Sequence, residues 1–350
     1  KMQIVKENIF GIFFVASLVF LAVIISKFLS FNNLLVSSAF ISILLGLLIS
    51  NSFNVTKQID WFTNFSLKKL LRIGIGFLGF SLSLTELFNY GSISLLLVIL
   101  NIVIAFIILN SLCKFFGIPN SLGYLITMGT CICGVTAVIA TSSIIKSNKD
   151  ETSYAVAIVT LFGMIAVFTY PYLAHYLFAL TPELAGVFLG TAIHDTAQVS
   201  AAGVIYSEMY DSEVALNSSM TTKLLRNSFL ILLIPLISYL YNKEKNVDIK
   251  SSIKDFFPLF VLGFIFCSLL RTIGDATIIH SNIIFYWDYF LVYIKDISKY
   301  FILFAMVALG LQTNLKSMTK LGIKPLAIGF AASASVGIFS ILFLLYFYSY

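Results

Sequence analysis

Two similar glycine-led segments contain the residues best suited to binding chemistry. Residues 129–140 read GTCICGVTAVIA and residues 190–201 read GTAIHDTAQVSA, with identical Gly, Thr, Ile, Val and Ala at five aligned positions. The second segment adds His194 and Asp195, and Gln198 follows on the same side of the outgoing helix. A histidine with its ordinary pKa near neutrality can carry protons, and amide and hydroxyl groups can bind a polar ligand.

Because both segments are apolar, we expect each to be a helix interrupted near the middle of a membrane. Non-helical backbone survives at that depth only where protein or a water-filled cavity surrounds it. Gly129 and Gly134 bracket the first expected break and Gly190 precedes the second, and glycine permits unwound backbone. The freed N–H groups near Gly134 and Asp195 are partial-positive helix ends suited to an anion. The alternative is two ordinary spans whose glycines allow close helix packing.

The side chains at the breaks have competing interpretations. Thr130 and Thr191 offer hydroxyl donors to a ligand. His194 is either a coupling group or a buried histidine that fixes the turn, and Asp195 is favoured as a helix N-cap. The Cys131 and Cys133 pair lacks the further Cys and His residues of a metal site, so both are interpreted as small residues of the break.

A third polar stretch, NSSMTTKLLRN at residues 217–227, lies inside an apolar segment. At helical spacing Ser219, Lys223 and Arg226 share one face, with Asn227 adjacent. Charged residues at membrane depth are costly and by default mark a pathway or site. We expect Lys223 and Arg226 to supply positive charge to an anion path, and the alternative is that they snorkel to the membrane surface. The expected substrate-binding set is Gly129, Thr130, Cys131, Cys133, Gly134, Gly190, Thr191, His194, Gln198, Lys223 and Arg226, with His194 and Asp195 as coupling candidates and no metal or catalytic residue.

The elements that position these residues are membrane helices. Hydrophobic residues make up 59% of the 350 and charged residues 11%, against about 25% charged in soluble domains. Apolar runs of the length that crosses about 30 Å of hydrocarbon follow one another along the chain. The composition predicts an all-α polytopic membrane protein with a single transmembrane domain over residues 1–350.

We expect nine full spans and two interrupted segments. The full spans lie near residues 9–28, 34–50, 69–86, 91–113, 151–178, 213–242, 256–273, 286–312 and 323–347, and the interrupted segments at 119–146 and 182–207. Helix starts are predicted at TPEL, where the Thr181 hydroxyl caps the helix and Pro182 takes the first helical position, in NKDET at residues 148–152, and after Ser212.

Lysine and arginine in the short loops predict that the N-terminus is cytoplasmic. The loop at Lys146 is undecided. It is external if 119–146 crosses the membrane, and cytoplasmic if that segment is a re-entrant hairpin, which fits the charge rule better. Two such hairpins would enter from opposite faces and meet at their tips.

A second repeat relates residues 78–95 to residues 309–326 without gaps. Five Leu and Gly positions match, and the predicted topology makes the two copies run in opposite directions. Inverted repeats of this kind are common in secondary transporters, although Gly and Leu can also match by chance in an apolar chain.

Four motifs in order resemble the YeiH-like family of bacterial inner-membrane proteins, usually labelled sulfate exporters. They are LLRIGIGFLGFSLSL, GTCICGVTAVIATSSII, LGTAIHDTAQVSAAG and TTKLLRNSFLILLIP, and the resemblance extends from about residue 34 onward. It implies a transporter related to the bile-acid/sodium symporters, with inverted repeats and interrupted helices crossing at a central site. This chain departs from the common family pattern in having Cys131 in place of Ala or Ser, and Asp195 in place of Glu.

Together these features predict a secondary active transporter of a small anion, sulfate or a sulfonated or carboxylated organic acid, working by alternating access. The family label suggests export, and the direction of transport stays open. Coupling to H⁺ through His194 or to Na⁺ through break carbonyls both stay open, and no cofactor is expected. A passive anion channel is the alternative, and an intramembrane enzyme is disfavoured because no nucleophile, base and metal set is present. The absence of a Walker A motif argues against ATP as the driver. The expected setting is the bacterial inner membrane, with lipid and an anionic substrate as partners, a homodimer left open and no nucleic acid.

Overall fold

The computed structural model of the chain describes residues 2–31, 36–53, 56–245, 259–278, 284–313 and 323–348. Over these ranges every regular element is a helix, so the all-α prediction is confirmed. The chain divides into two compact units that interleave in sequence. Unit 1 comprises residues 1–89, 200–217 and 259–316, and unit 2 comprises residues 90–199, 218–258 and 317–350.

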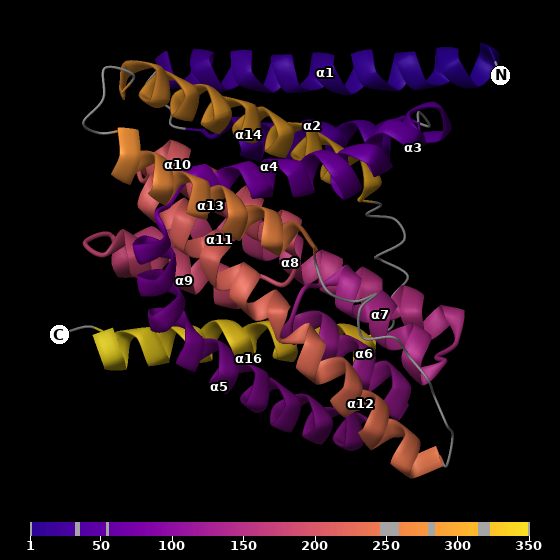
Figure 1. Ribbon diagram of the computed structural model, residues 1–350. Coiled ribbons are helices and arrows are strands. Elements are labelled where there is room, and N and C mark those ends of the chain that lie inside the picture. The colour runs from indigo at the N-terminus through magenta and orange to yellow at the C-terminus, as the bar shows by residue number, and fades with distance from the viewer. Residues whose placement is uncertain are drawn as a thin grey trace. The chain divides into compact units, whose positions relative to one another are not determined.

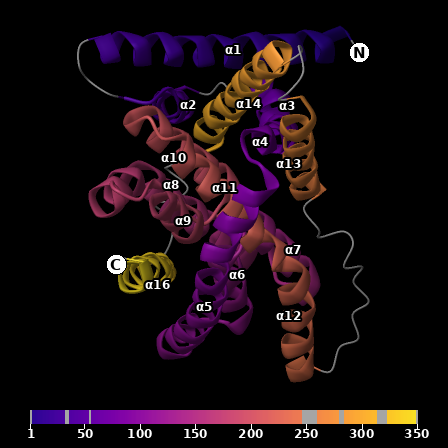
Figure 2. The ribbon, with the colours of Figure 1, turned by 60° about the vertical axis from the view of Figure 1, so that its left-hand side comes forward.

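Unit 1 is built mainly from the N-terminal helices and two helices late in the chain. Its elements are α1 (Met2–Phe31), α2 (Ser38–Ser52), α3 (Thr56–Phe65), the π-helical turn η1 (Ser66–Leu70), α4 (Leu71–Leu78), the 3₁₀ turn η2 (Gly79–Ser81), α13 (Leu259–Ile278) and α14 (Ile284–Gln312). Helix α14 packs against α2, α4 and α1, and Figures 1 and 2 draw α1, α2 and α14 side by side.

Small residues allow the closest packing in unit 1. A Cβ atom placed on Gly46 of α2 would lie 2.8 Å from the Gly310 Cα of α14, and one on Gly310 would meet the backbone of α2 in the same way. Without a hydrophobic driving force between helices in lipid, this close approach is how membrane helices gain van der Waals contact.

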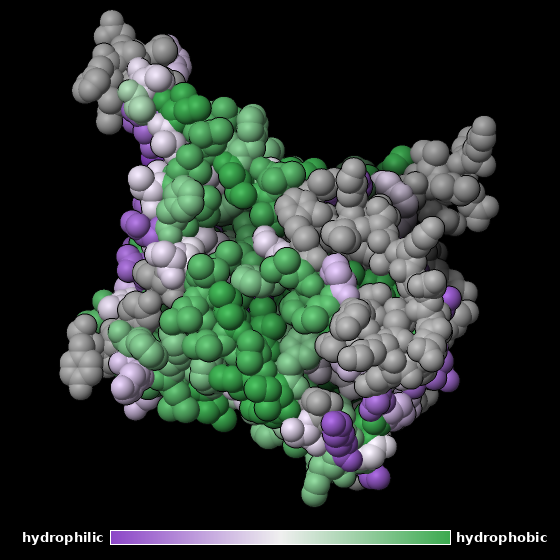
Figure 3. Space-filling model, turned by 60° about the horizontal axis from the view of Figure 1, so that its bottom comes forward, coloured by the Kyte–Doolittle hydropathy of each residue, from purple (hydrophilic) through white to green (hydrophobic). Residues whose placement is uncertain are grey.

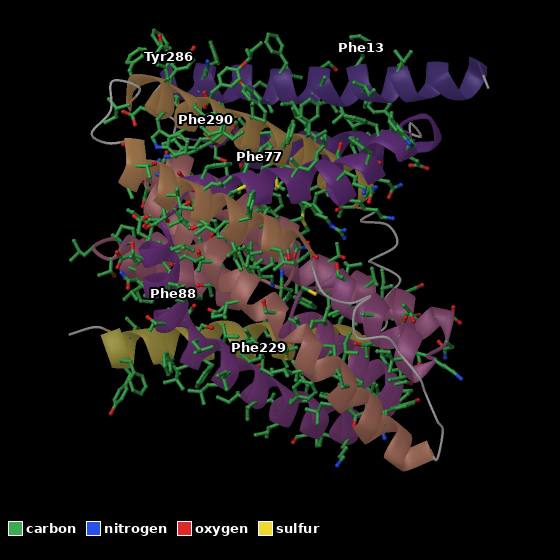
Figure 4. All side chains as sticks on the ribbon, in the orientation of Figure 1. Phe13, Phe77, Phe88, Phe229, Tyr286 and Phe290 are labelled. Carbon is green, nitrogen blue, oxygen red and sulfur yellow. The ribbon has the colours of Figure 1, made fainter. Side chains whose placement is uncertain are left out.

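Unit 2 contains both predicted breaks. Its elements are α6 (Asn120–Cys131), α7 (Val135–Ile145), α8 (Lys149–Phe178), α9 (Pro182–Ala192), α12 (Leu230–Lys245) and α16 (Ile323–Tyr348). Three further helices carry the chain between the units: α5 (Leu84–Phe116), α10 (Thr196–Tyr210) and α11 (Glu213–Ser228). The apolar core of unit 2 joins residues of α5, α6, α7, α8, α12 and α16. Phe229, labelled in Figure 4 between α11 and α12, packs against this core.

Five helical stretches in the described residues are long and apolar enough to cross a membrane: Ile9–Phe31, Ser94–Phe116, Asp150–Phe178, Glu213–Ile237 and Leu326–Phe347. A sixth is formed if the bent pair Ile59–Ser81 and Leu84–Ser92 counts as one span. Each lies on a predicted span, and the total of nine full spans stays a prediction.

Exposed aromatic side chains occur on α1 and α14 of unit 1. Phe13 of α1 is 72% exposed and Tyr286 of α14 is 71% exposed, and both are labelled in Figure 4. The face drawn in Figure 3 is dominated by hydrophobic residues, with hydrophilic ones near its margins. A surface of this composition requires lipid around it, because soluble proteins rarely expose contiguous apolar patches of more than a few hundred Å².

One predicted boundary is wrong. The expected span 69–86 is interrupted, because η2 ends at Ser81 and α5 begins at Leu84 with the axis turned by 104°. Ser83 and Glu86 form a capping box: the Ser83 N–H donates to Glu86 Oε2 (2.8 Å) and the Glu86 N–H to Ser83 Oγ (3.3 Å). The sequence S-x-x-E at residues 83–86 therefore starts a new helix inside the apolar run.

The other predicted helix starts agree with the structure. Asn148 Oδ1 accepts the Glu151 N–H (2.7 Å) at the start of α8, and Ser212 Oγ accepts the Ala215 N–H (3.4 Å) at the start of α11. Pro182 occupies the first turn of α9 as predicted, but the predicted cap is wrong in one respect: the Thr181 side chain makes no capping hydrogen bond. The second copy of the 78–95 repeat lies partly outside the described residues, at 314–322, so the inverted repeat stays a prediction.

Candidate functional site

The first break separates α6 from α7 by three residues. Ile132 has φ −123° and ψ −90°, and Gly134 has φ 67° and ψ −129°, a conformation open only to glycine. The Gly134 N–H donates to the Gly129 carbonyl (3.0 Å), and a Cβ on Gly129 would lie 2.7 Å from Val138 Cγ2. Residues nine apart in a continuous helix cannot touch, so the chain bends sharply between α6 and α7. Whether this segment is a re-entrant hairpin or a broken span stays a prediction.

The second break separates α9 from α10 and has a different form. Ile193 is extended, with φ −89° and ψ 138°, and His194 and Asp195 precede Thr196 of α10. The Asp195 carboxylate accepts the Ala197 N–H (2.9 Å), and Gln198 Oε1 accepts the Asp195 N–H (3.2 Å), which together form a capping box. Asp195 is therefore the N-cap that the sequence predicts.

The two breaks touch each other within unit 2. A Cβ atom on Gly134 would lie 2.7 Å from both Cβ and Oδ2 of Asp195. The Val135 N–H, at the start of α7, also donates to Asp195. The Asp195 carboxylate thus serves the N-terminal ends of α7 and α10 together, where negative charge is stabilised by the helix dipoles.

Lys223 reaches from α11 to the opposite, carbonyl-bearing ends of the broken helices. Its ammonium donates to the carbonyls of Ile132 (2.8 Å), Ile193 (3.1 Å) and His194. These three acceptors match the three donors of an ammonium group. The side chain is fully buried, so every donor is used inside the protein.

Arg226, one turn further along α11, completes the pattern. Its guanidinium donates to the carbonyls of Thr191 (2.6 Å), Ile193 (3.2 Å), Cys131 and Thr130. Its exposed fraction is 1%. The C-terminal ends of α6 and α9 carry partial negative charge, so both cations are placed where the helix dipoles favour them.

The snorkelling alternative for these two residues is therefore wrong. Both residues lie in the span Glu213–Ile237. In its most apolar stretch 65% of the residues are buried inside the protein, the largest fraction among the five spans. Their side chains turn toward the breaks and away from any membrane surface, because their hydrogen bonds go to residues 130–132 and 191–194.

The charges at the facing breaks do not cancel. Lys223 and Arg226 contribute two positive charges and Asp195 one negative charge. The two C-terminal helix ends contribute roughly −0.5 each and the two N-terminal ends roughly +0.5 each, so the dipoles cancel among themselves. With His194 neutral, the site has a formal excess of about one positive charge inside a low-dielectric region, where an unpaired charge is costly.

His194 has one free ring atom at this site. Its ring donates to the Thr130 backbone carbonyl, whereas its Nδ1 has no hydrogen-bond partner although the residue is 1% exposed. The hydroxyl of Thr222, beside Lys223 in α11, is also buried without a partner. Native proteins pair nearly all such atoms, so each orphan is a place where a ligand or water can bind.

The remaining predicted residues have structural contacts. The Thr191 hydroxyl donates to the Val187 carbonyl of its own helix (2.8 Å), and Gln198 Nε2 donates to the Thr160 carbonyl of α8 (3.2 Å). Neither donor points to a ligand. Gly190 permits the close approach of α11, since a Cβ there would lie 2.7 Å from Thr222 Cβ. Cys131 and Cys133 are buried free thiols.

The backbone carbonyls of Ile132 and Ile193 are the main acceptors. An isoleucine side chain gives no sign of this role, so neither residue was predicted for the site. Thr222 was not singled out, and Asn227 was named only as adjacent to the basic face; the Asn227 amide donates to Thr196 Oγ1 (3.1 Å). The polar stretch 217–227 was the available signal for both residues.

These features define an all-helical membrane protein with two interrupted helices held at a buried charge cluster. The chain belongs to the family described as Conserved hypothetical protein 698, whose model matches residues 10–329. It is similar to UPF0324 membrane proteins of Fusobacterium nucleatum (31% identical, covering 88% of this chain and 90% of the relative), Streptococcus pneumoniae (32%, covering 82% and 83%) and Streptococcus agalactiae (30%, covering 96% of each). No solved structure matches the chain.

Proposed function

We propose that this protein is a secondary active transporter of a small anion, in the bacterial inner membrane with its N-terminus in the cytoplasm. One observation carries the proposal: two fully buried cations and one partly buried carboxylate meet at facing helix breaks, leaving about one positive charge uncompensated. A bound monovalent or divalent anion supplies the missing charge. Burying an ion without a partner is costly, so the substrate stabilises the site by neutralising it.

The substrate class follows from charge and from the family resemblance. The resemblance to the sulfate exporters implies sulfate or a related oxyanion, while the names of the curated relatives specify no substrate. Arginine and lysine both bind sulfate, sulfonate and carboxylate oxygens, arginine in a two-pronged manner. The orphan Thr222 hydroxyl provides a neutral donor for the same ligand, whereas Nδ1 of neutral His194 is an acceptor and contacts it through a water or a protonated ligand oxygen.

Alternating access fits the burial of the cations better than an open pore does. Lys223 and Arg226 are at most 1% exposed, and each of their hydrogen bonds goes to a break carbonyl. An anion reaches them only when the chain around the breaks moves. Interrupted helices with binding sites at the break are the arrangement that secondary transporters use for this purpose.

The direct test is a thermal-unfolding screen of purified protein with sulfate, thiosulfate, sulfonates and dicarboxylates, all added as choline salts at constant choline concentration. The expected result is stabilisation by at least one of these anions. Losing a charged hydrogen bond costs about 1.5–3 kcal/mol, so Lys223→Ala should bind that anion about 10–100-fold more weakly. Lys295→Ala, which removes a partly exposed lysine paired with Glu213 (2.7 Å), is the matched control and should bind normally.

Counterflow in proteoliposomes separates a carrier from a channel. Trans-loaded unlabelled anion should drive uptake of the labelled anion against its gradient, which a passive pore does not do. Stabilisation by no anion, or equal binding by Lys223→Ala and the wild type, would contradict the proposed site. Anion flux without counterflow would show that the protein is an anion channel and not a transporter.

A further inference from the structure

The carbonyls that surround the Lys223 ammonium have the composition of a cation site. Three backbone oxygens converge on one point, from Ile132 of the first break and from Ile193 and His194 of the second. Rings of backbone carbonyls replace the hydration shell of K⁺ and Na⁺ in membrane proteins. The oxygens also lie at the C-terminal ends of α6 and α9, where the helix dipoles are negative.

The site is built independently of Lys223. The Ile132 and Ile193 N–H groups donate to Met128 and Leu189 (3.2 Å in each case), which closes the last turns of α6 and α9. Arg226 donates to neighbouring carbonyls of both breaks and shares the Ile193 oxygen. Removing the Lys223 side chain alone leaves these contacts in place, together with the electrostatic influence of Asp195 on the site.

We propose that the facing break carbonyls of Ile132, Ile193 and His194 form a binding site for a small monovalent cation, which the ammonium of Lys223 fills from within the chain. The lysine replaces a diffusible ion, so no Na⁺ or K⁺ is needed to hold the two breaks together. One consequence rests on the transport function proposed above: anion transport does not depend on external Na⁺.

The test exchanges the tethered cation for a free one. Purified Lys223→Ala is unfolded thermally in 150 mM chloride salts of Na⁺, K⁺, ammonium, methylammonium or choline, so that the anion is constant. We expect its melting temperature to be about 2–4 °C higher in Na⁺, K⁺, ammonium or methylammonium than in choline, which is too large for the site. The wild type and Lys295→Ala should show no such difference.

A second variant guards against poor folding. Lys223→Ser also vacates the site and should show the same dependence on small cations. The proposal is overturned if both variants unfold at the same temperature in all five salts, if the wild type shows an equal dependence, or if neither variant folds in any salt. Because chloride is constant, these outcomes do not depend on whether the protein binds a substrate anion. Conversely, failure of the anion screen leaves this result standing.

Discussion

Replacing Gly134 by alanine tests the contact between the two breaks. Gly134 has φ 67° and ψ −129°, outside the left-handed helical region that other residues occasionally adopt. Forcing alanine into positive φ costs about 1–2 kcal/mol. The new Cβ would also lie 2.7 Å from Asp195 Oδ2, so the carboxylate must leave its position. Losing that N-cap costs about 1 kcal/mol more.

The expected destabilisation is therefore about 2–3 kcal/mol. At an unfolding entropy of about 2.1 cal/mol/K per residue, this corresponds to a fall in melting temperature of about 3–4 °C for a chain of this length. The assay is thermal unfolding of the purified protein in detergent, followed by intrinsic fluorescence.

Two glycines of the same chain separate the contributions. Gly117 also has positive φ (65°), but an added Cβ would meet nothing within 4 Å, so Gly117→Ala measures the backbone cost alone. Gly76, helical and equally open, should tolerate alanine with no loss. If Gly134→Ala lowers the melting temperature no more than Gly117→Ala does, the proposed contact between Gly134 and Asp195 is refuted.

Three further predictions concern the site and the core of unit 1. Asp195→Asn keeps an N-cap oxygen and should change the free energy of unfolding by less than about 1 kcal/mol, whereas Asp195→Ala should lose about 1–2 kcal/mol; equal losses in thermal or chemical unfolding would contradict the capping role. Thr191→Val should leave anion-induced stabilisation unchanged, because the hydroxyl already bonds to Val187 within its helix; a loss of binding more than about 10-fold would show that the hydroxyl reaches the ligand. Gly46→Ala should destabilise the protein by more than about 2 kcal/mol, since its Cβ would contact the α14 backbone, and Gly76→Ala is again the control.

The sequence predicted the helical breaks well because glycine and capping residues act locally. The positive φ at Gly134 and the N-cap at Asp195 depend on neighbours within a few residues, which the primary structure displays directly. Ser83 and Glu86 form a capping box by equally local contacts, but the surrounding residues are apolar. The predicted span 69–86 therefore ran across the turn that this capping box follows.

The partners of Lys223 and Arg226 could not be predicted in this way. Their acceptors are backbone carbonyls about 30 and about 90 positions away in sequence, so side-chain type gave no information about them. The sequence predicted that Lys223 and Arg226 place positive charge inside the protein. Only the fold shows that both side chains donate to carbonyls at the C-terminal ends of α6 and α9. Likewise, the hydroxyl of Thr191 was expected to face a ligand, but it finds a nearer acceptor in its own helix.

The position of Lys223 and Arg226 one turn apart on α11 has a mechanical consequence. A single rigid helix holds carbonyls from both breaks through seven hydrogen bonds, and the Ile193 oxygen is shared by the two side chains. A shift of α11 along its axis by one turn, about 5.4 Å, exceeds the reach of every one of these bonds at once. The two interrupted helices consequently share one set of hydrogen bonds, and a movement of α11 that breaks these bonds frees both breaks from α11 together.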